Sequence, residues 1–397
     1  MIICEKKNIN FLMHKRVILI TSPLQVLNAR SAINNLEKRK NVEEIILICH
    51  ATTGKNANVI KIIKRLASKL DFDKIYNISE YLHDKSKINL KKSLWKKIIN
   101  IKSNIKKNNF QIIRQTEVLH NFFKDKNILP DEIFLRKKYN DDEIIVSNLL
   151  MRKYTKFYFI EDGTADYNFR LNFKLKFKNK IKKIIYKNFI SLPLSIIFFE
   201  NLRDIKKIFF LKKIKAKKKF LNLSRNGYVS TKKNFIYNLK KVSEKRDKLI
   251  NQIVNPEILI IGTIHDIGVG FTAEDEINTY NKLIGIIRNK YGVTKNKIFY
   301  KPHPRISKEN FNKKVNSLGC MVIEANEDRL VEEYFITNNI KAIYSVGSTA
   351  MLYAKEIFGI DCYVIDLSNY KDLKRNMPLR KNMLDFHNRY KIKSVKL

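Results

Sequence analysis

The chain has 397 residues, more than one ordinary hydrophobic core accommodates, so two domains are the starting expectation. Apolar residues make up 44% of it, which excludes an intrinsically disordered chain. The 79 Lys and Arg residues outnumber the 38 Asp and Glu residues, and the resulting net charge of +41 favours anionic partners such as membrane lipid, nucleic acid or acidic sugars.

The four cysteines have neither metal-site spacing nor the pattern of a disulfide framework. Cys49, Cys320 and Cys362 lie in or beside apolar runs, so we expect buried free thiols. The longest apolar run, 189–199, is too short to span a membrane, and no signal peptide is recognisable. These features predict a cytoplasmic protein without a transmembrane span.

The first part of the chain alternates between apolar runs and amphipathic stretches, which predicts a Rossmann-type half. Ser22 and Gln25 follow the first apolar run and would face a ligand at the carboxyl end of that strand, although a helix N-cap explains Ser22 equally well. Strands are expected at 16–20, 44–49, 74–76, 143–147 and 156–160, and helices at 24–39, 58–70 and 89–107.

An acidic loop follows the strand expected at 156–160. Glu161, Asp162 and Gly163 stand at its carboxyl end, which is where parallel sheets bind ligands. A carboxylate there can act as a general base or hold a hydroxyl group, and the glycine permits a tight loop. A turn capped by an aspartate is the simpler alternative.

The composition changes between about 170 and 220, where lysines alternate with aromatic and aliphatic residues and the only acidic residues are Glu200 and Asp204. This pattern is typical of a segment that binds an anionic membrane surface. The alternative is a helical excursion packed on its own domain. Residues 224–255 are predicted to form a charged connector.

A second α/β unit is expected after this connector, with Gly262 and Asp266 in the loop that follows its first strand. A short helix expected at 328–337 carries Glu332. Strands are expected at 258–261, 297–300, 321–323, 341–344 and 362–365, and the other helices at 274–290, 309–318 and 350–358.

The strand expected at 297–300 continues into Lys301-Pro302-His303-Pro304-Arg305. The two prolines stiffen this exit and hold His303 between two cations. Such a group can make charge-assisted hydrogen bonds to a phosphate, whereas a turn with a surface histidine is the plainer alternative.

Gly347, Ser348 and Thr349 open the helix expected at 350–358. Hydroxyl groups and free backbone N–H groups at a helix N-terminus suit an anion, and a plain Ser/Thr N-cap is the alternative. No Gly-Lys-Ser/Thr ending is present, so this is not a Walker A loop.

As a set, three of these stretches resemble the motifs of bacterial sialyltransferases. These are the acidic Glu161-Asp162-Gly163, the His-Pro stretch around His303 and the pair Ser348-Thr349. The run Ser22-Pro23-Leu24-Gln25 is most similar to glycosyltransferase family 52, the lipooligosaccharide sialyltransferases, with the family 38 polysialyltransferases a close second.

This resemblance implies an α/β fold of GT-B type, in which two Rossmann-like domains face a cleft. It extends over 257–366 and, in patches, over 14–170. The implied organisation is an acceptor-side domain at 14–223 with a basic insert at about 170–220, the connector at 224–255, a CMP-donor domain at 256–375 and a basic tail at 376–397.

The resemblance also implies an inverting transfer of sialic acid, or a related nonulosonic acid, from CMP-sialic acid, without a metal or other cofactor. His303 would hold the donor phosphate and assist departure of CMP, and Glu332 would bind the ribose. Asp162 and Asp266 both remain candidates for the catalytic base. Ser348, Thr349, Lys301, Arg305, Gly347 and Gly262 would help to bind the donor, and Glu161, Gly163, Ser22 and Gln25 would support the site.

The acceptor implied is a cell-surface glycan or glycolipid, as in lipooligosaccharide or capsule. Such an enzyme would work in the cytoplasm, peripherally on the inner face of the bacterial inner membrane, through the basic insert; a homodimer is left open. A CDP-glycerol or CMP-Kdo type transferase is the enzymatic alternative. A membrane- or nucleic-acid-binding basic protein is the alternative of another class, but no recognisable nucleic-acid-binding motif supports a nucleic-acid partner.

Overall fold

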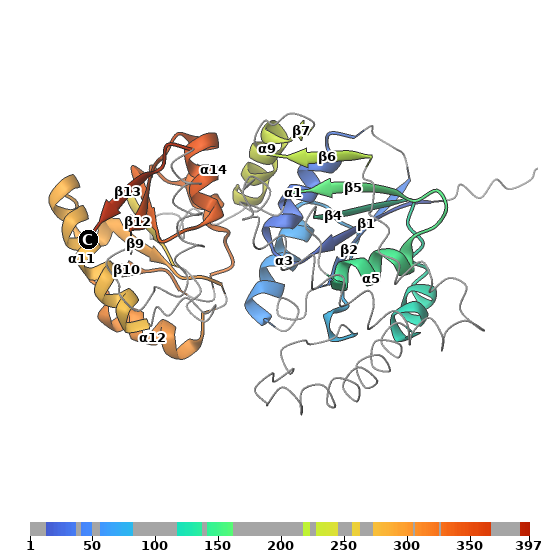
Figure 1. Ribbon diagram of the computed structural model, residues 1–397, viewed down its shortest axis with the longest axis horizontal. Helices are drawn as coiled ribbons and strands as arrows, with labels where there is room; N and C mark the ends of the chain where they lie inside the picture. Colours follow the sequence, from blue (N-terminus) through green and yellow to red (C-terminus); the bar gives the residue numbers. More distant parts are fainter. Residues whose placement is uncertain are drawn as a thin grey trace, which may run out of the picture.

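The computed structural model describes residues 13–36, 41–49, 56–81, 117–136, 141–161, 217–222, 228–244, 256–262, 273–304, 306–324, 327–366 and 390–397. Within these residues the chain forms two parallel sheets, each flanked by helices. They lie side by side in Figure 1, the first in blue to yellow-green and the second in yellow-orange to red. The two Rossmann-like domains predicted from the sequence are therefore confirmed.

The first sheet has the order β3-β2-β1-β4-β5-β6-β7, and all its neighbouring strands are parallel. The chain adds strands on one side of β1 and then continues on the other side from β4, so the carboxyl ends of β1 and β4 mark a topological switch point. The strands are β1 (His14–Ile20), β2 (Val42–Ile48), β3 (Lys74–Asn77), β4 (Glu132–Arg136), β5 (Lys156–Ile160), β6 (Lys218–Leu221) and β7 (Val229–Ser230).

Alternate residues of β1 point to two different apolar layers, because successive side chains of a strand face opposite sides of the sheet. Ile18 and Ile20 pack with α1 (Leu24–Ile33), α3 (Ala57–Lys69) and α9 (Lys232–Ser243). Val17 and Leu19 pack with α5 (Asp141–Leu150) and with residues 117–125. Burial on both faces explains why the strands are continuous apolar runs.

The prediction of a strand at 143–147 is wrong, because these residues lie in α5. The fully buried Glu143 pairs with Arg136 at the end of β4, so an acidic side chain is accommodated inside the helix packing. Strand β4 itself was not predicted. Its apolar centre is short, and its buried Glu132 is balanced by Arg16 of β1, with 2.7 Å between Oε2 and Nε.

The predicted domain boundaries need two corrections in the first half. Residues 218–221, at the end of the predicted basic insert, form β6 beside β5. The predicted connector contains β7 and α9, and α9 buries Phe235, Leu239 and Val242 in the core of the first domain. The helix expected at 89–107, most of the insert and the end of the connector lie outside the described residues.

The second sheet has the order β10-β9-β8-β11-β12-β13, again with all neighbours parallel. Its strands are β8 (Ile258–Ile261), β9 (Ile298–Lys301), β10 (Met321–Val322), β11 (Ala342–Ser345), β12 (Asp361–Asp366) and β13 (Lys393–Lys396). Its helices are α11 (Ala273–Tyr291), α12 (Lys308–Ser317), α13 (Val331–Thr337) and α14 (Thr349–Phe358). A short 3₁₀ turn, η3 (Lys295–Lys297), precedes β9, and another, η1 (Ser79–Tyr81), follows β3 in the first domain.

Strand β13 corrects the prediction of a basic tail at 376–397. Its four residues pair with β12, and Val395 packs against the core of the second sheet. Basic residues on either side of a single apolar position concealed a short edge strand. Residues 393–396 therefore belong to the second sheet.

Cys49, Cys320 and Cys362 are buried and free, as predicted. Burial raises the pKa of the Cys320 and Cys362 thiols to about 12, so both remain protonated. Among the described residues, no helix is long and apolar enough to cross a membrane.

Candidate functional site

Three of the predicted loops are brought to one edge of the second sheet. Strand β8 lies between β9 and β11 and is hydrogen-bonded to both, with Ile261 level with Lys301 and with Ser345. Gly262, the His303 loop and the start of α14 follow these three residues. Because all the strands are parallel, these loops leave the sheet next to one another.

The His303 loop is stiff and partly exposed. Lys301 and Pro302 are buried, whereas His303 and Pro304 are half-buried. The Ile306 N–H donates to the His303 carbonyl at 2.9 Å and closes the turn. His303 therefore lies in the turn that follows β9, while Arg305 lies outside the described residues.

Gly262 is held in place by its neighbours. Its N–H donates to the Lys301 carbonyl at 2.9 Å, and a Cβ atom on it would lie 2.2 Å from the Tyr300 hydroxyl oxygen. A glycine is thus required here by close packing, whatever the ligand. The residues that follow, including Asp266, lie outside the described residues.

Below Gly262 is a buried polar cluster that the sequence analysis did not find, consisting of Tyr300, Glu276 and Lys314. The Tyr300 hydroxyl donates to Glu276 Oε1 at 3.1 Å and accepts from Lys314 Nζ at 3.0 Å, and Lys314 forms an ion pair with Glu276. Burial, followed by the Glu276 charge, raises the pKa of Tyr300 well above its usual value. The sequence does not indicate that Lys314 is buried, because the chain contains many lysines and most are expected on the surface.

The Ser348 region forms the N-terminus of α14. Ser348 is the N-cap, and its Oγ accepts from the Ala350 N–H at 3.3 Å, so the N-cap alternative is confirmed. The Gly347 N–H donates to Ser345 Oγ at 3.2 Å, and Ser345 Oγ donates to the Ile261 carbonyl at 2.9 Å. This chain of bonds ties the start of α14 to β8. The side chain of Thr349 is not among those described.

Glu332 lies in the first turn of α13 and is buried. Burial, with a smaller contribution from the negative charge of Glu333, raises its pKa to about 7. A carboxyl group that titrates near neutrality can either accept or donate a hydrogen bond to a hydroxyl group.

Glu161, from the acidic motif, is almost fully buried at the exit of β5. Its Oε2 accepts from the Asn222 N–H at 2.7 Å, and its Oε1 accepts from the hydroxyl of Tyr353 on α14. Both carboxylate oxygens are therefore held inside the protein, across the two domains. Asp162 and Gly163 lie outside the described residues.

The loop that follows β1 is also stabilised by a buried side chain. Gln25 is fully buried, and its Oε1 accepts from the N–H groups of Thr21 at 2.6 Å and Ser22 at 3.3 Å. Ser22 is half-buried, and the N-cap of α1 is Pro23, so the N-cap alternative for Ser22 is not found. Gln25 shapes this loop from inside rather than lining an open surface.

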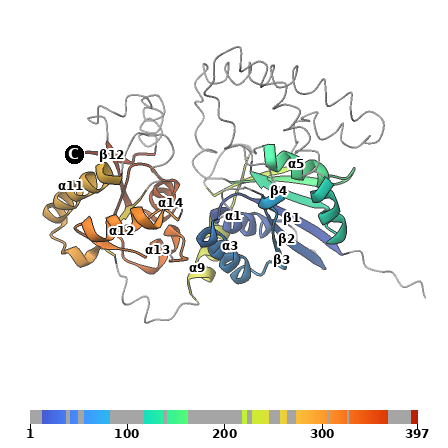
Figure 2. The ribbon, with the colours of Figure 1, turned by 90° about the horizontal axis from the view of Figure 1, so that it is seen from below.

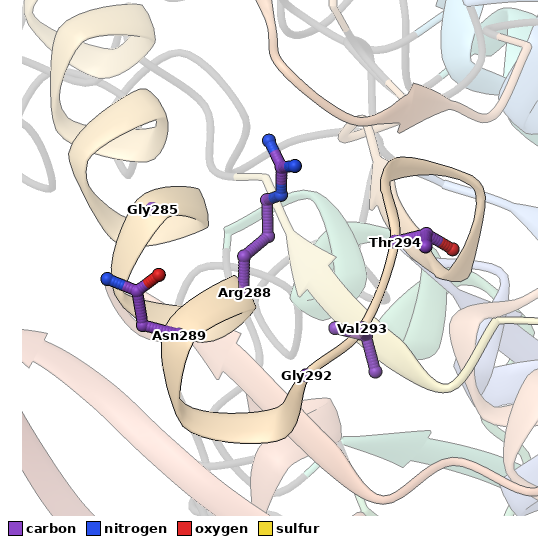
Figure 3. Close-up of a pocket in the computed structure, with 6 residues that line it drawn as sticks. All are labelled: Gly285, Arg288, Asn289, Gly292, Val293 and Thr294. Carbon is purple, nitrogen blue, oxygen red and sulfur yellow. The ribbon is translucent and has the colours of Figure 1, made fainter.

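A surface pocket at the carboxyl end of α11 is not part of this site (Figure 3). Helix α11 returns from the exit of β8 to the start of β9, so its last turn lies at the opposite edge of the sheet from the candidate loops. The pocket is lined by Gly285, Arg288, Asn289, Gly292, Val293 and Thr294.

No group of three or more His, Cys, Asp or Glu side chains that could hold a metal ion occurs among the described residues. Since Asp162 and Asp266 fall outside them, the absence of a metal requirement stays a prediction.

Several solved structures resemble the chain at low similarity. UDP-GlcNAc 2-epimerase from Neisseria meningitidis, bound to UDP-GlcNAc, has a TM-score of 0.46 and 12% identity, covering 94% of this chain and 91% of that one. An α/β-galactoside α-2,3-sialyltransferase from Photobacterium phosphoreum has a TM-score of 0.46 and 13% identity, covering 96% and 99%. No curated protein sequence matches the chain significantly.

At the level of sequence, one protein family matches most of the chain. The alpha-2,8-polysialyltransferase (POLYST) family matches residues 16–365, which takes in most of both sheets and all three predicted motifs. The resemblance to bacterial sialyltransferases is thereby confirmed, through the second of the two families named from the sequence. The protein is a glycosyltransferase of the sialyltransferase type, and the chain belongs to the alpha-2,8-polysialyltransferase family.

Proposed function

We propose that the protein transfers sialic acid, or a related nonulosonic acid, from CMP-sialic acid to a glycan acceptor, with inversion at the anomeric carbon. The observation that carries this proposal is the convergence of Gly262, the His303 loop and the capped start of α14 at neighbouring strand exits. A histidine and a helix N-terminus on one edge are suited to a phosphate.

In this reaction the acceptor hydroxyl oxygen attacks the anomeric carbon, and the bond from that carbon to the CMP phosphate oxygen breaks. Negative charge builds on the phosphate as CMP leaves. His303 and the N-terminal amides of α14 are groups of the right kind to stabilise that charge, because they are fixed before the reaction begins.

The acceptor proton needs a carboxylate base. Asp162 and Asp266 both remain candidates, because each follows a strand exit in the sequence. A base placed there contributes about 10²–10⁴ in rate. A single displacement of this kind inverts the anomeric configuration.

Glu332 is proposed to bind the ribose of CMP. Its carboxyl group is buried and has a pKa of about 7, so a ribose hydroxyl would supply a hydrogen-bond partner inside the protein. The proposal includes no metal ion and no other cofactor, since fixed protein groups are assigned to the phosphate charge.

The acceptor is proposed to be a glycan on the cytoplasmic side of the bacterial inner membrane, such as a lipooligosaccharide or capsule precursor. The lysine-rich residues of the predicted basic insert would bind anionic lipid there. Most of the insert lies outside the described residues, so the support for this part is the sequence pattern.

The test measures CMP release and sugar transfer with CMP-sialic acid, using galactoside and sialoside acceptors in buffer with EDTA. CMP-Kdo and CDP-glycerol are assayed in parallel as competing donors. We expect transfer from CMP-sialic acid; turnover of another donor alone would overturn the proposal. A requirement for Mg²⁺ or Mn²⁺ would refute its metal-free part.

A pair of histidine variants then tests the phosphate role. His303→Ala is expected to lower turnover by about 10²–10³, because it removes a donor to the developing charge. His120→Ala is the matched control, since His120 is exposed on residues 117–125, outside the candidate loops. Equal rates for the two variants would exclude the proposed role of His303.

A further inference from the structure

The two domains meet through packed helices. In Figure 2, α9 lies between the helices α13 and α14 of the second domain and the helix α1 of the first, and Figure 1 shows it between α14 and α1. One apolar cluster crosses this surface, and the rings of Phe235 on α9 and Tyr353 on α14 are 5.2 Å apart. Leu330 and Leu352 of the second domain belong to the same cluster.

A polar contact is embedded in this apolar surface. Tyr353 and Glu161 are both buried, and the Tyr353 hydroxyl donates to Glu161 Oε1. Asn222 and Asn28 hold Glu161 from the first domain, through a backbone N–H to Oε2 at 2.7 Å and a side-chain amide to the Glu161 carbonyl at 3.1 Å. Tyr353 therefore supplies the partner from the second domain.

The two residues of this contact lie next to two parts of the candidate site. Glu161 is the residue before Asp162, at the exit of β5. Tyr353 lies about one and a half turns along α14 from the N-cap Ser348. The hydrogen bond thus joins the helix assigned to the donor phosphate to the loop that carries a candidate base.

We propose that Tyr353 is a positioning residue that fixes α14 against the acidic loop, so that donor and acceptor groups are held at the reacting distance. This inference rests on the proposed function. The bond spans the two domains, so it forms only in their packed arrangement, and its loss leaves a buried carboxylate with one partner fewer. A small displacement between reacting groups has a large effect on rate.

The variant Tyr353→Phe removes only the hydroxyl and keeps the ring that packs on Phe235. Tyr280→Phe is the matched control, because Tyr280 is equally buried but lies within the core of the second domain, beside Tyr300. For each protein, CMP affinity is measured by calorimetry, and CMP release is measured with and without an acceptor.

We expect Tyr353→Phe to lower the kcat of transfer about tenfold, the size of effect that loss of one hydrogen bond to a charged group produces. CMP affinity, acceptor KM and acceptor-independent CMP release should stay within about twofold of the wild type, since no binding group is removed. An unchanged kcat of transfer, or an equal fall in transfer and in acceptor-independent release, would overturn the proposal.

A mutant cycle keeps the idea testable if the tyrosine variant is also less stable. Glu161→Asp keeps the charge but shortens the side chain away from Tyr353. If the two residues act through one contact, the double variant should lose no more transfer activity than the more impaired single variant. Fully multiplicative losses would show independent roles and overturn the proposal.

Hydrogen exchange tests the positioning role of Tyr353 without relying on enzymatic activity. If the wild type does not use CMP-sialic acid, the proposed function fails, but the contact can still be measured. Tyr353→Phe should then speed exchange at the Asn222 amide and the first turn of α14, whereas Tyr280→Phe should not. No difference between the two variants would show that the bond positions nothing.

Discussion

Lys314 offers a sharp test of how the second domain is held together. Its side chain is completely buried on α12, where it forms an ion pair with the equally buried Glu276 of α11 and donates to the Tyr300 hydroxyl at 3.0 Å. The change Lys314→Met keeps much of the length and volume of the side chain but removes the charge. It leaves the Glu276 carboxylate buried without its cation.

Removing one partner of a buried ion pair costs about 3–5 kcal/mol, because the remaining charge stays away from water. Most of that cost should appear as lost unfolding free energy of the second domain, measured by urea titration. The double change Lys314→Met with Glu276→Met should recover most of it, because replacing a whole buried pair by apolar groups is often neutral.

The adjacent residue supplies the control. Lys313 lies on the same helix and pairs with Glu309 four residues earlier, but 57% and 76% of these two side chains are exposed. Lys313→Met should leave the urea midpoint unchanged within error, because exposed ion pairs contribute little. Equal midpoints for the Lys314 and Lys313 variants would refute the reasoning, as would a double variant no more stable than Lys314→Met.

Two further predictions use unfolding measurements. Gly262→Ala should lower the unfolding free energy by about 1–3 kcal/mol, because the new Cβ would overlap the Tyr300 hydroxyl. Gly285→Ala on α11 is the control: a Cβ there would meet nothing within 4 Å, so the unfolding free energy should rise by about 0.5–1 kcal/mol. The reverse order of stabilities would contradict the packing at Gly262. For Glu332, folding raises the pKa from 4.5 to about 7, so the unfolded chain releases this proton first and wild-type stability falls as pH rises through that window. Glu332→Gln should remove this fall in stability. The variant should be more stable than the wild type above pH 7 by up to about 3 kcal/mol, and the difference should vanish near pH 4. Parallel pH–stability curves for the two proteins would count against the raised pKa of Glu332.

The sequence predicts most of the fold because parallel strands covered on both faces must be continuous apolar runs. Strands such as β1 and β8 satisfy this rule and were found within a residue or two. Strand β4 was missed because charged residues bracket its short apolar centre. The run at 143–147 was assigned to a strand because five residues do not distinguish a buried helix from a strand.

The candidate site was predicted at the level of loops. The His-Pro stretch and Ser348 do follow strands β9 and β11, which pair with β8 on its two sides. The contacts that organise these loops were not predictable, because they join residues far apart in the chain. Tyr353 and Glu161 are separated by 192 residues, and nothing in the sequence around either of them indicates the other.

The former connector gives the clearest view of how the domains are joined. Helix α9 packs on α1 in the first domain and on α13 in the second, so it is part of the interface rather than a tether. A second polar link lies nearby, where Arg65 of α3 donates to Glu333 of α13 and, at 2.8 Å, to the Asp328 carbonyl. Separating the domains would expose the shared apolar cluster and remove both links. The packed arrangement is therefore maintained by burial and by charge together, and α14, whose N-terminus is proposed to bind the donor phosphate, belongs to the surface that maintains it.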